Sequence, residues 1–172
     1  MSHSRMVPIR RRAGAAALLT IAACAAVFLS FPAHAKSERE PLGLCAGADD
    51  EIRLDLRVSG VRSPDGEVAI VLYGGRAKDF LAKGAWVNRV RVPATKGTVE
   101  TCLLAPQPGQ YAIALYHDED ANGKLNKTWI GIPDEGFGFS NDAPAPLRAP
   151  RFDEAAFTAG TGDNPLEITL RY

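Results

Sequence analysis

The stretch EIRLDLRV, residues 51–58, decides the fold class of this chain. Its apolar residues, Ile52, Leu54, Leu56 and Val58, alternate with charged ones. Side chains of a β-strand point alternately to opposite faces, so this period of two predicts a strand with one dry and one wet face. The remaining elements can be predicted outward from this strand.

The segments that follow continue the strand pattern. Residues 67–73 are apolar on both faces, which predicts a central strand. In residues 111–117 large apolar residues alternate with small alanines, as expected where another layer packs closely. A short helical turn is predicted at residues 79–82, with Phe80 and Leu81 capping an end of the sandwich. The other strands are predicted at residues 86–92, 98–104 and 166–172.

Short strands with turn signals about every 8 to 12 residues, without a long amphipathic helix, predict an all-β protein. We expect an antiparallel two-sheet sandwich of about seven strands. A small barrel is the alternative. Residues 118–150 break the rhythm with a run dominated by Gly, Pro, Asp and Asn. Loops of that length are usually functional or disordered, and the aromatic residues Trp129, Phe137 and Phe139 argue for order. Any site is therefore expected in this loop.

The N-terminal residues have the features of a signal peptide over residues 1–35. Arg5 and residues 10–12 form a basic region, an apolar run follows, and Ala33-His34-Ala35 has the spacing of a cleavage site. Cleavage there predicts a periplasmic or secreted protein.

The predicted mature chain starts at Lys36. A lead-in at residues 36–50 then precedes a β-sandwich domain at residues 51–172. Two alternatives remain open, a membrane anchor formed by residues 13–31 and lipidation at Cys24. After cleavage, no transmembrane segment is expected.

Charge argues against one class of partner. Removal of residues 1–35 leaves 16 basic against 20 acidic residues. Phosphate binding needs a basic stripe, and none is visible, so no nucleic acid partner is expected. About 137 mature residues suit one domain, which at that size buries about two thirds of its unfolded surface.

Only Cys45 and Cys102 survive the predicted cleavage. Two thiols in an oxidising compartment tend to form a disulfide, which would tie the lead-in to a central strand. The alternative is two separate buried thiols.

From Asp118 the sequence matches the first half of a calcium-binding loop. Asp118, Asp120 and Asn122 occupy ligand positions one, three and five, Gly123 position six, and Lys124 offers its backbone carbonyl at position seven. The second half does not match, because Trp129 stands where an EF-hand has a bidentate glutamate. The missing ligands are expected from Asp134, Glu135 or Asp142. Alternatively, the side chains only cap turns by accepting backbone N–H bonds.

His117 is the only histidine left after the predicted cleavage. It can form a His–carboxylate pair with Asp118, or simply orient the loop backbone. Phe137 and Phe139 alternate with glycines, which can present both rings as a platform for a sugar or peptide, or pin the loop to the sandwich. Trp86 and Trp129 can serve either purpose. We therefore treat His117, Trp129, Phe137 and Phe139 as candidate ligand-binding residues.

Two segments of the loop, HDEDANGKL at residues 117–125 and GIPDEGFGFSND at residues 131–142, carry a resemblance. Shorter matching stretches lie at residues 66–69, 108–112 and 152–157. Over residues 51–172 the chain resembles the exported bacterial family known as domain of unknown function 2141. The resemblance implies an exported protein with an immunoglobulin-like or transthyretin-like β-sandwich. It implies no catalytic residues.

These observations favour an exported, non-enzymatic β-sandwich module. Its loop, organised by calcium or by turns, is expected to bind a glycan or protein of the envelope. The alternative is a hydrolase built on His117, Asp118 and Glu135. A third interpretation is a purely structural adaptor. The sequence names no reaction.

Overall fold

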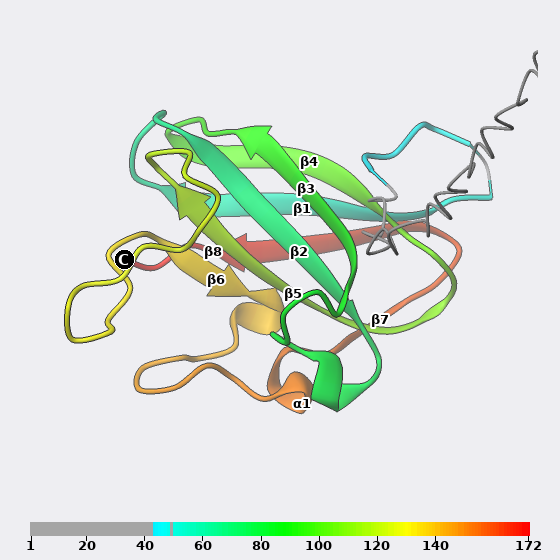
Figure 1. Ribbon diagram of the computed structural model, residues 1–172. Helices are drawn as coiled ribbons and strands as arrows, with labels where there is room; N and C mark the ends of the chain where they lie inside the picture. The colour runs from blue at the N-terminus through cyan, green and yellow to red at the C-terminus, as the bar shows by residue number, and fades with distance from the viewer. Residues whose placement is uncertain (1–42, 49) are drawn as a thin grey trace, which may run out of the picture. The chain divides into compact units, whose positions relative to one another are not determined.

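The computed structural model describes residues 43–48 and 50–172, which belong to one compact unit, Glu38–Tyr172. Two β-sheets pack face to face in this unit (Figure 1). The predicted sandwich is confirmed, and the described strands do not close into a barrel. Almost fully buried side chains from both inner faces form the core: Leu54, Val58, Leu103 and Ile168 from one sheet, and Val68, Ile70, Leu72 and Ile113 from the other.

The first sheet has the strand order β4-β1-β8. Its members are β1 (Ile52–Val61), β4 (Gly97–Ala105) and β8 (Gly162–Thr169). In β1 the predicted alternation is present, because Ile52, Leu54, Leu56 and Val58 are buried while the residues between them are not. Strand β8 covers the predicted last strand only in part, because it begins and ends earlier.

One pairing in this sheet is parallel. Strand β1 pairs antiparallel with β4 but parallel with β8. The direction follows from where the chain enters: β7 (Phe157–Ala159) pairs with the start of β5, at the end of the sandwich where β1 also begins. From there Gly162 donates its backbone N–H to the carbonyl of Glu51 (3.0 Å), so β8 starts beside the start of β1.

The second sheet has the order β3-β2-β5-β6, and β7 pairs with β5 outside this path. Its pairs are all antiparallel. Strand β2 lies between two neighbours, as its two apolar faces predicted. The bounds are β2 (Glu67–Gly74), β3 (Trp86–Pro93), β5 (Gly109–Asp118) and β6 (Phe137–Phe139).

A second, smaller apolar cluster covers the outer face of β5. The side chains of Ala112 and Ala114 meet the rings of Phe139 and Phe152 there, with Phe80 at the edge. The small alanines predicted to allow a close-packed layer therefore do so. Two helical elements contribute to this layer, η2 (Ser140–Asp142) and α1 (Phe152–Ala155).

The predicted helical turn is displaced. The helical residues are Ala77–Asp79, labelled η1, and residues 80–82 are not helical. Phe80 packs into the outer cluster, against Tyr73 with a ring-centroid distance of 5.4 Å. Leu81 does not cap the sandwich: it has a φ of 61° and is 38% exposed.

The lead-in is tied to the sandwich at two points. The predicted disulfide joins Cys45 and Cys102, with a Cα–Cα distance of 5.6 Å. Beside it the buried side chain of Asn88 donates to the carbonyls of Gly43 (3.0 Å) and Leu104 (2.8 Å). Buried polar groups need such partners, so Asn88 holds the lead-in against β3 and β4.

The predicted signal peptide at residues 1–35 lies outside the described residues. So do the alternatives involving Cys24 and residues 13–31, and most of the lead-in predicted at residues 36–50. Within the described part of the chain, no helix has the length and apolar character needed to cross a membrane.

Candidate functional site

The loop that follows β5 is ordered, and β6 divides it in two. Strand β6 pairs with β5, with Phe139 opposite Ala114 and Phe137 opposite Tyr116. The pairing leaves two excursions, residues 119–136 and residues 143–151. Apart from Asp142, which lies in η2, every candidate ligand or binding residue predicted from the sequence lies in the first excursion, in β6, or at the end of β5.

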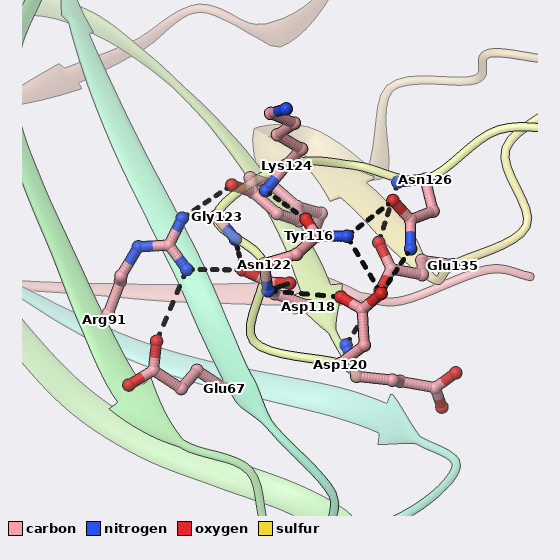
Figure 2. A network of polar contacts seen from close by, with 11 residues as sticks. Glu67, Arg91, Tyr116, Asp118, Asp120, Asn122, Gly123, Lys124, Asn126 and Glu135 are labelled. Atoms are coloured by element: carbon pink, nitrogen blue, oxygen red, sulfur yellow. Dashed lines mark hydrogen bonds and ion pairs between the residues drawn. The ribbon is translucent and has the colours of Figure 1, made fainter.

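Asp118, the last residue of β5, is buried and organises the start of the first excursion (Figure 2). Its Oδ1 accepts the backbone N–H of Asn122 (3.0 Å), and its Oδ2 accepts that of Gly123 (2.9 Å). Arg91, on β3, donates its Nη1 to the same Oδ2 (2.6 Å). This buried charge is therefore paired and hydrogen-bonded, as burial requires.

Asp120 and Asn122 form the next layer of the turn. Asp120 accepts the backbone N–H of Asn122 (3.1 Å) through Oδ1, and the side-chain amides of Asn122 (2.8 Å) and Asn126 (2.9 Å) through Oδ2. The hydrogen bond from Asn126 is the main cause that lowers the pKa of Asp120. Asn122 Oδ1 in turn accepts the backbone N–H of Lys124 (2.9 Å), whose side chain points away from the carboxylates in Figure 2. Successive side chains thus cap successive backbone groups.

Glu135 closes the excursion. Although it lies far along the loop, it is only 4% exposed. Its Oε1 accepts the backbone N–H of Glu119 (2.9 Å), and its Oε2 accepts that of Asn126 (2.8 Å). One carboxylate therefore joins two distant parts of the loop.

Three carboxylates come together in the described part of the chain. Asp118, Asp120 and Glu135 each offer an oxygen, and these oxygens lie within 4.8 Å of one another. Asp134 is not in this group. It is exposed, and it joins the loop through its backbone, donating its N–H to Asn126 (3.0 Å) and offering its carbonyl to Arg62 (3.2 Å). Asp142 is also elsewhere, because its carboxylate accepts the backbone N–H of Thr169 (2.7 Å).

The loop bends at the glycine that the calcium pattern requires. Gly123 has a φ of 83°, a conformation that glycine adopts without steric penalty. The local turn of a calcium loop is therefore present, with side-chain oxygens from positions one, three and five of the pattern close to it. Trp129, at position twelve, lies far out on the loop and is 97% exposed.

His117 is fully buried, and both ring nitrogens have partners. Nε2 lies 2.7 Å from the carbonyl oxygen of Asp65, and Nδ1 lies 2.7 Å from the hydroxyl of Tyr172. A carbonyl can only accept, so Nε2 carries the proton, and in the neutral ring Nδ1 accepts from Tyr172. His117 thus joins the turn before β2 to the last residues of the chain.

A surface ion pair braces the same region. Arg62 Nε donates to Glu119 Oε1 (2.7 Å), and its guanidinium stacks over the ring of Tyr172 at 4.3 Å. The hydrogen bond from Arg62 is the main cause that lowers the pKa of Glu119. Glu119 Oε1 lies 3.6 Å from His117 Nδ1, beyond hydrogen-bonding distance.

The two phenylalanines of β6 mainly anchor the loop to the sandwich and do not form a fully exposed platform for a ligand. Phe139 is 8% exposed and packs against Phe80 and Phe137, with ring-centroid distances of 6.2 and 6.0 Å. Phe137 is partly buried. Gly136, whose carbonyl accepts the backbone N–H of His117 (2.8 Å), has a packing role, because a Cβ on this residue would clash with the ring of Tyr172.

Apolar clefts open beside these rings. Two adjoining hollows of about 390 and 500 Å³ lie where the first excursion faces the second. Four large apolar side chains beside or near them are exposed: Trp129 (97%), Ile130 (58%), Ile132 (56%) and Leu147 (99%). The residues shared by both hollows are Ile132, Pro133, Phe137, Phe139, Ala145 and Pro146.

Of these exposed side chains, the sequence-based prediction included only Trp129. It missed Ile130, Ile132 and Leu147. The signal was present in TWIGIP, residues 128–133, where three large apolar residues fall within a run of turn residues. Leu147 alone among prolines and alanines gives a much weaker signal.

The structure thus defines a class: a β-sandwich with a carboxylate-braced loop at one end. The sequence model of a bacterial family, described as an uncharacterized protein conserved in bacteria (DUF2141), matches residues 56–167. The chain belongs to this family, as the resemblance of its loop motifs indicated. Searches of curated proteins and of solved structures find no match.

Proposed function

We propose that this protein is an exported, non-enzymatic β-sandwich module that binds a glycan or protein of the cell envelope. The observation that carries the proposal is the group of exposed apolar side chains around the clefts, formed by Trp129, Ile130, Ile132 and Leu147. Large exposed apolar surfaces on a soluble domain mark interaction sites. Trp129 provides a flat ring for stacking, and Phe137 lies in the cleft wall.

The state of His117 favours a binding module over the hydrolase. A general base needs a nitrogen within reach of the substrate's proton. In His117 one nitrogen donates to Asp65 and the other accepts from Tyr172, and the ring has no exposed surface. The hydroxyl of Ser140, which lies in the same loop, is buried and donates to the carbonyl of Ala155 (2.5 Å), so it is not available as a nucleophile.

We also propose that calcium organises the loop. The convergence of oxygens from Asp118, Asp120 and Glu135 supports this, and Asn122 Oδ1 with the Lys124 carbonyl would complete an all-oxygen shell. Arg91 already neutralises part of the charge of Asp118, and backbone N–H groups already occupy the carboxylates. We therefore expect weak binding, with a Kd on the order of 10⁻⁴ to 10⁻³ M.

Calcium binding is tested by thermal unfolding with and without millimolar calcium. Because calcium would bind the folded state, Tm should rise with calcium, and Asp120→Ala should remove the rise. Asp50→Ala, an exposed carboxylate outside the group, should keep it. If Tm does not respond to calcium and titration calorimetry finds no heat, the carboxylates act only as turn caps.

Envelope binding is tested by mixing the purified protein with isolated cell-wall polymer and, separately, with solubilised envelope proteins. Trp129→Ala should lower retention on the bound component about tenfold. Leu44→Ala removes a side chain that is 51% exposed outside this surface, and should bind as the wild type does. Equal retention of the two variants would contradict a role for this surface.

Export is tested by the intact mass of the protein recovered from the cell envelope. A chain that begins at Lys36 is the expected result, because Ala33-His34-Ala35 has the cleavage spacing. A diacylated chain that begins at Cys24 would replace the proposed processing by lipidation.

A further inference from the structure

The tips of the two loop excursions are the most apolar exposed points of the described residues. Trp129 is 97% exposed at one tip and Leu147 is 99% exposed at the other. Both tips border the same cleft, and in Figure 1 the yellow and orange loops project on the same side of the sandwich as β6. We infer that these tips form a face that docks on an anionic lipid bilayer. This goes beyond the proposed function, because the partner is a lipid surface.

The backbone of the first tip is closed on itself. Thr128 donates its N–H to the carbonyl of Ile132 (2.8 Å), and Gly131 donates to the carbonyl of Thr128 (2.9 Å). Ile132 donates to Thr128 Oγ1 (3.2 Å). A segment that enters an apolar phase must pair its polar backbone groups internally. This tip can therefore carry Trp129 and Ile130 into a bilayer with few unpaired N–H groups.

The second tip also has few unpaired backbone N–H groups, in this case because of its amino-acid composition. It reads APAPLRAP at residues 143–150, and its three prolines have no backbone N–H to desolvate. Arg148, next to Leu147, donates Nη1 to the carbonyl of Ala149 (2.9 Å). Leu147 thus stands at the end of a segment with few free donors.

The charges around the tips are complementary to an anionic surface. Residues 121–133 contain Lys124 and Lys127 and no acidic residue, and residues 143–151 contain two arginines and no acidic residue. The arginines pair with Glu154 and Asp153. Within the described part of the chain, neither lysine has a carboxylate partner, so both charges are free to attract anionic lipid headgroups.

The shape of the tips suits a lipid surface. Sites for small molecules are concave and bring several polar groups together. Here Trp129 lines neither hollow, and Leu147, which borders the second one, is still 99% exposed. A tryptophan with an apolar body and one N–H donor suits the boundary between lipid headgroups and acyl chains.

The test uses Trp129 as its own reporter. The chain has two tryptophans, so Trp86→Phe leaves Trp129 alone, and residues 1–42 contribute none. The protein recovered from cells is mixed with vesicles of phosphatidylglycerol and phosphatidylcholine whose acyl chains are brominated. We expect a blue shift and quenching of Trp129 fluorescence. Both should weaken with phosphatidylcholine alone and in 1 M salt, where the Debye length falls to about 3 Å.

Co-sedimentation with vesicles, measured on proteins that keep both tryptophans, separates the contributions of the apolar and the charged side chains. Leu147→Ser should lower partitioning about tenfold, and Lys127→Gln about fivefold. Leu44→Ser and Lys83→Gln are matched controls away from the tips and should leave partitioning onto vesicles unchanged. Absence of quenching, or equal partitioning of tip and control variants, would overturn the inference. So would shielding of Trp129 by cell-wall polymer or an envelope protein but not by vesicles, a result that would leave the proposed function standing.

Discussion

The sandwich core and the loop at residues 118–150 differ in the side chains that they bury and expose. In the core the side chains of Leu54, Ile70 and Leu72 have no exposed surface. In the loop two carboxylates, Asp118 and Glu135, are buried, while Trp129 and Leu147 are almost fully exposed. The first excursion is therefore held by polar contacts, while Phe139 anchors the middle of the loop by apolar packing. The apolar side chains at the tips remain free for another surface.

The core and the loop differ because strands and irregular loops pair their backbone N–H and C=O groups in different ways. Strands satisfy their N–H and C=O groups in ladders, so their side chains are free to form an apolar core. An irregular loop has no ladder and needs other acceptors. Asp118 and Glu135 accept two backbone N–H groups each, and Asp118 adds the Arg91 guanidinium.

The largest effect should come from the core. Leu72→Ala leaves a cavity between the sheets, and we expect a loss of about 2 to 5 kcal/mol in the free energy of unfolding. Trp129→Ala, although it removes a larger side chain, should change stability by less than about 0.5 kcal/mol. Chemical denaturation of both variants measures this contrast. A comparable loss in Trp129→Ala would show that the loop tip packs against the protein.

Asp118→Ala should approach the core effect. It leaves two backbone N–H groups and a guanidinium without their acceptor, and we expect a loss of about 3 kcal/mol. Asp120→Ala, at an exposed position with similar turn contacts, should lose only about 1 kcal/mol. If the two variants unfold alike in denaturant, burial of the Asp118 contacts adds nothing to the loop.

Glu135→Gln should have an intermediate and local effect. Glutamine keeps the size of the side chain but replaces one acceptor oxygen by an NH₂ group, which faces a backbone N–H. We expect a loss of about 1 to 2 kcal/mol. Hydrogen exchange should quicken at the amides of Glu119 and Asn126, and stay unchanged at the core amides of β2. Unaltered exchange at both loop amides would argue against the proposed closure by Glu135.

The smallest effect should depend on pH. Arg62 lowers the pKa of Glu119 in the folded state, so the pair stabilises the fold when the pH is above 4.5, the ordinary pKa of glutamate. This stabilisation disappears as pH falls below 4.5 through the lowered folded pKa. Arg62→Gln should cost below about 1 kcal/mol at neutral pH, since the pair lies at the surface.

Thermal melts from pH 3 to pH 7 measure this difference for wild type and Arg62→Gln. The two curves should converge at the acid end. Arg57→Gln, which removes the Arg57–Glu100 surface pair between β1 and β4, is a control distant from the loop. A difference in Tm that widens toward low pH would contradict the expected stabilisation by the Arg62–Glu119 pair.

Much of the fold was predictable because strand periodicity is a local property. The alternation in residues 52–58, the double apolar face of β2 and the alanines of β5 all correspond to observed burial. The three-residue strands β6 and β7 and the helix α1 are too short for periodicity to reveal. The parallel direction of β8 depends on where β7 leaves the second sheet, which no local pattern records.

By itself the sequence determined the sandwich class, the Cys45–Cys102 pair and the turn that begins at Asp118. Each follows from neighbouring residues or from a count. Only the tertiary structure decided that Glu135 joins Asp118 and Asp120 while Asp134 does not, and that His117 is bonded to Asp65 and Tyr172. The partners of His117 lie 52 and 55 residues away in sequence. Which groups share a buried space is set by how the strands pack, because the free energy of burying a polar group depends on the partner it meets there.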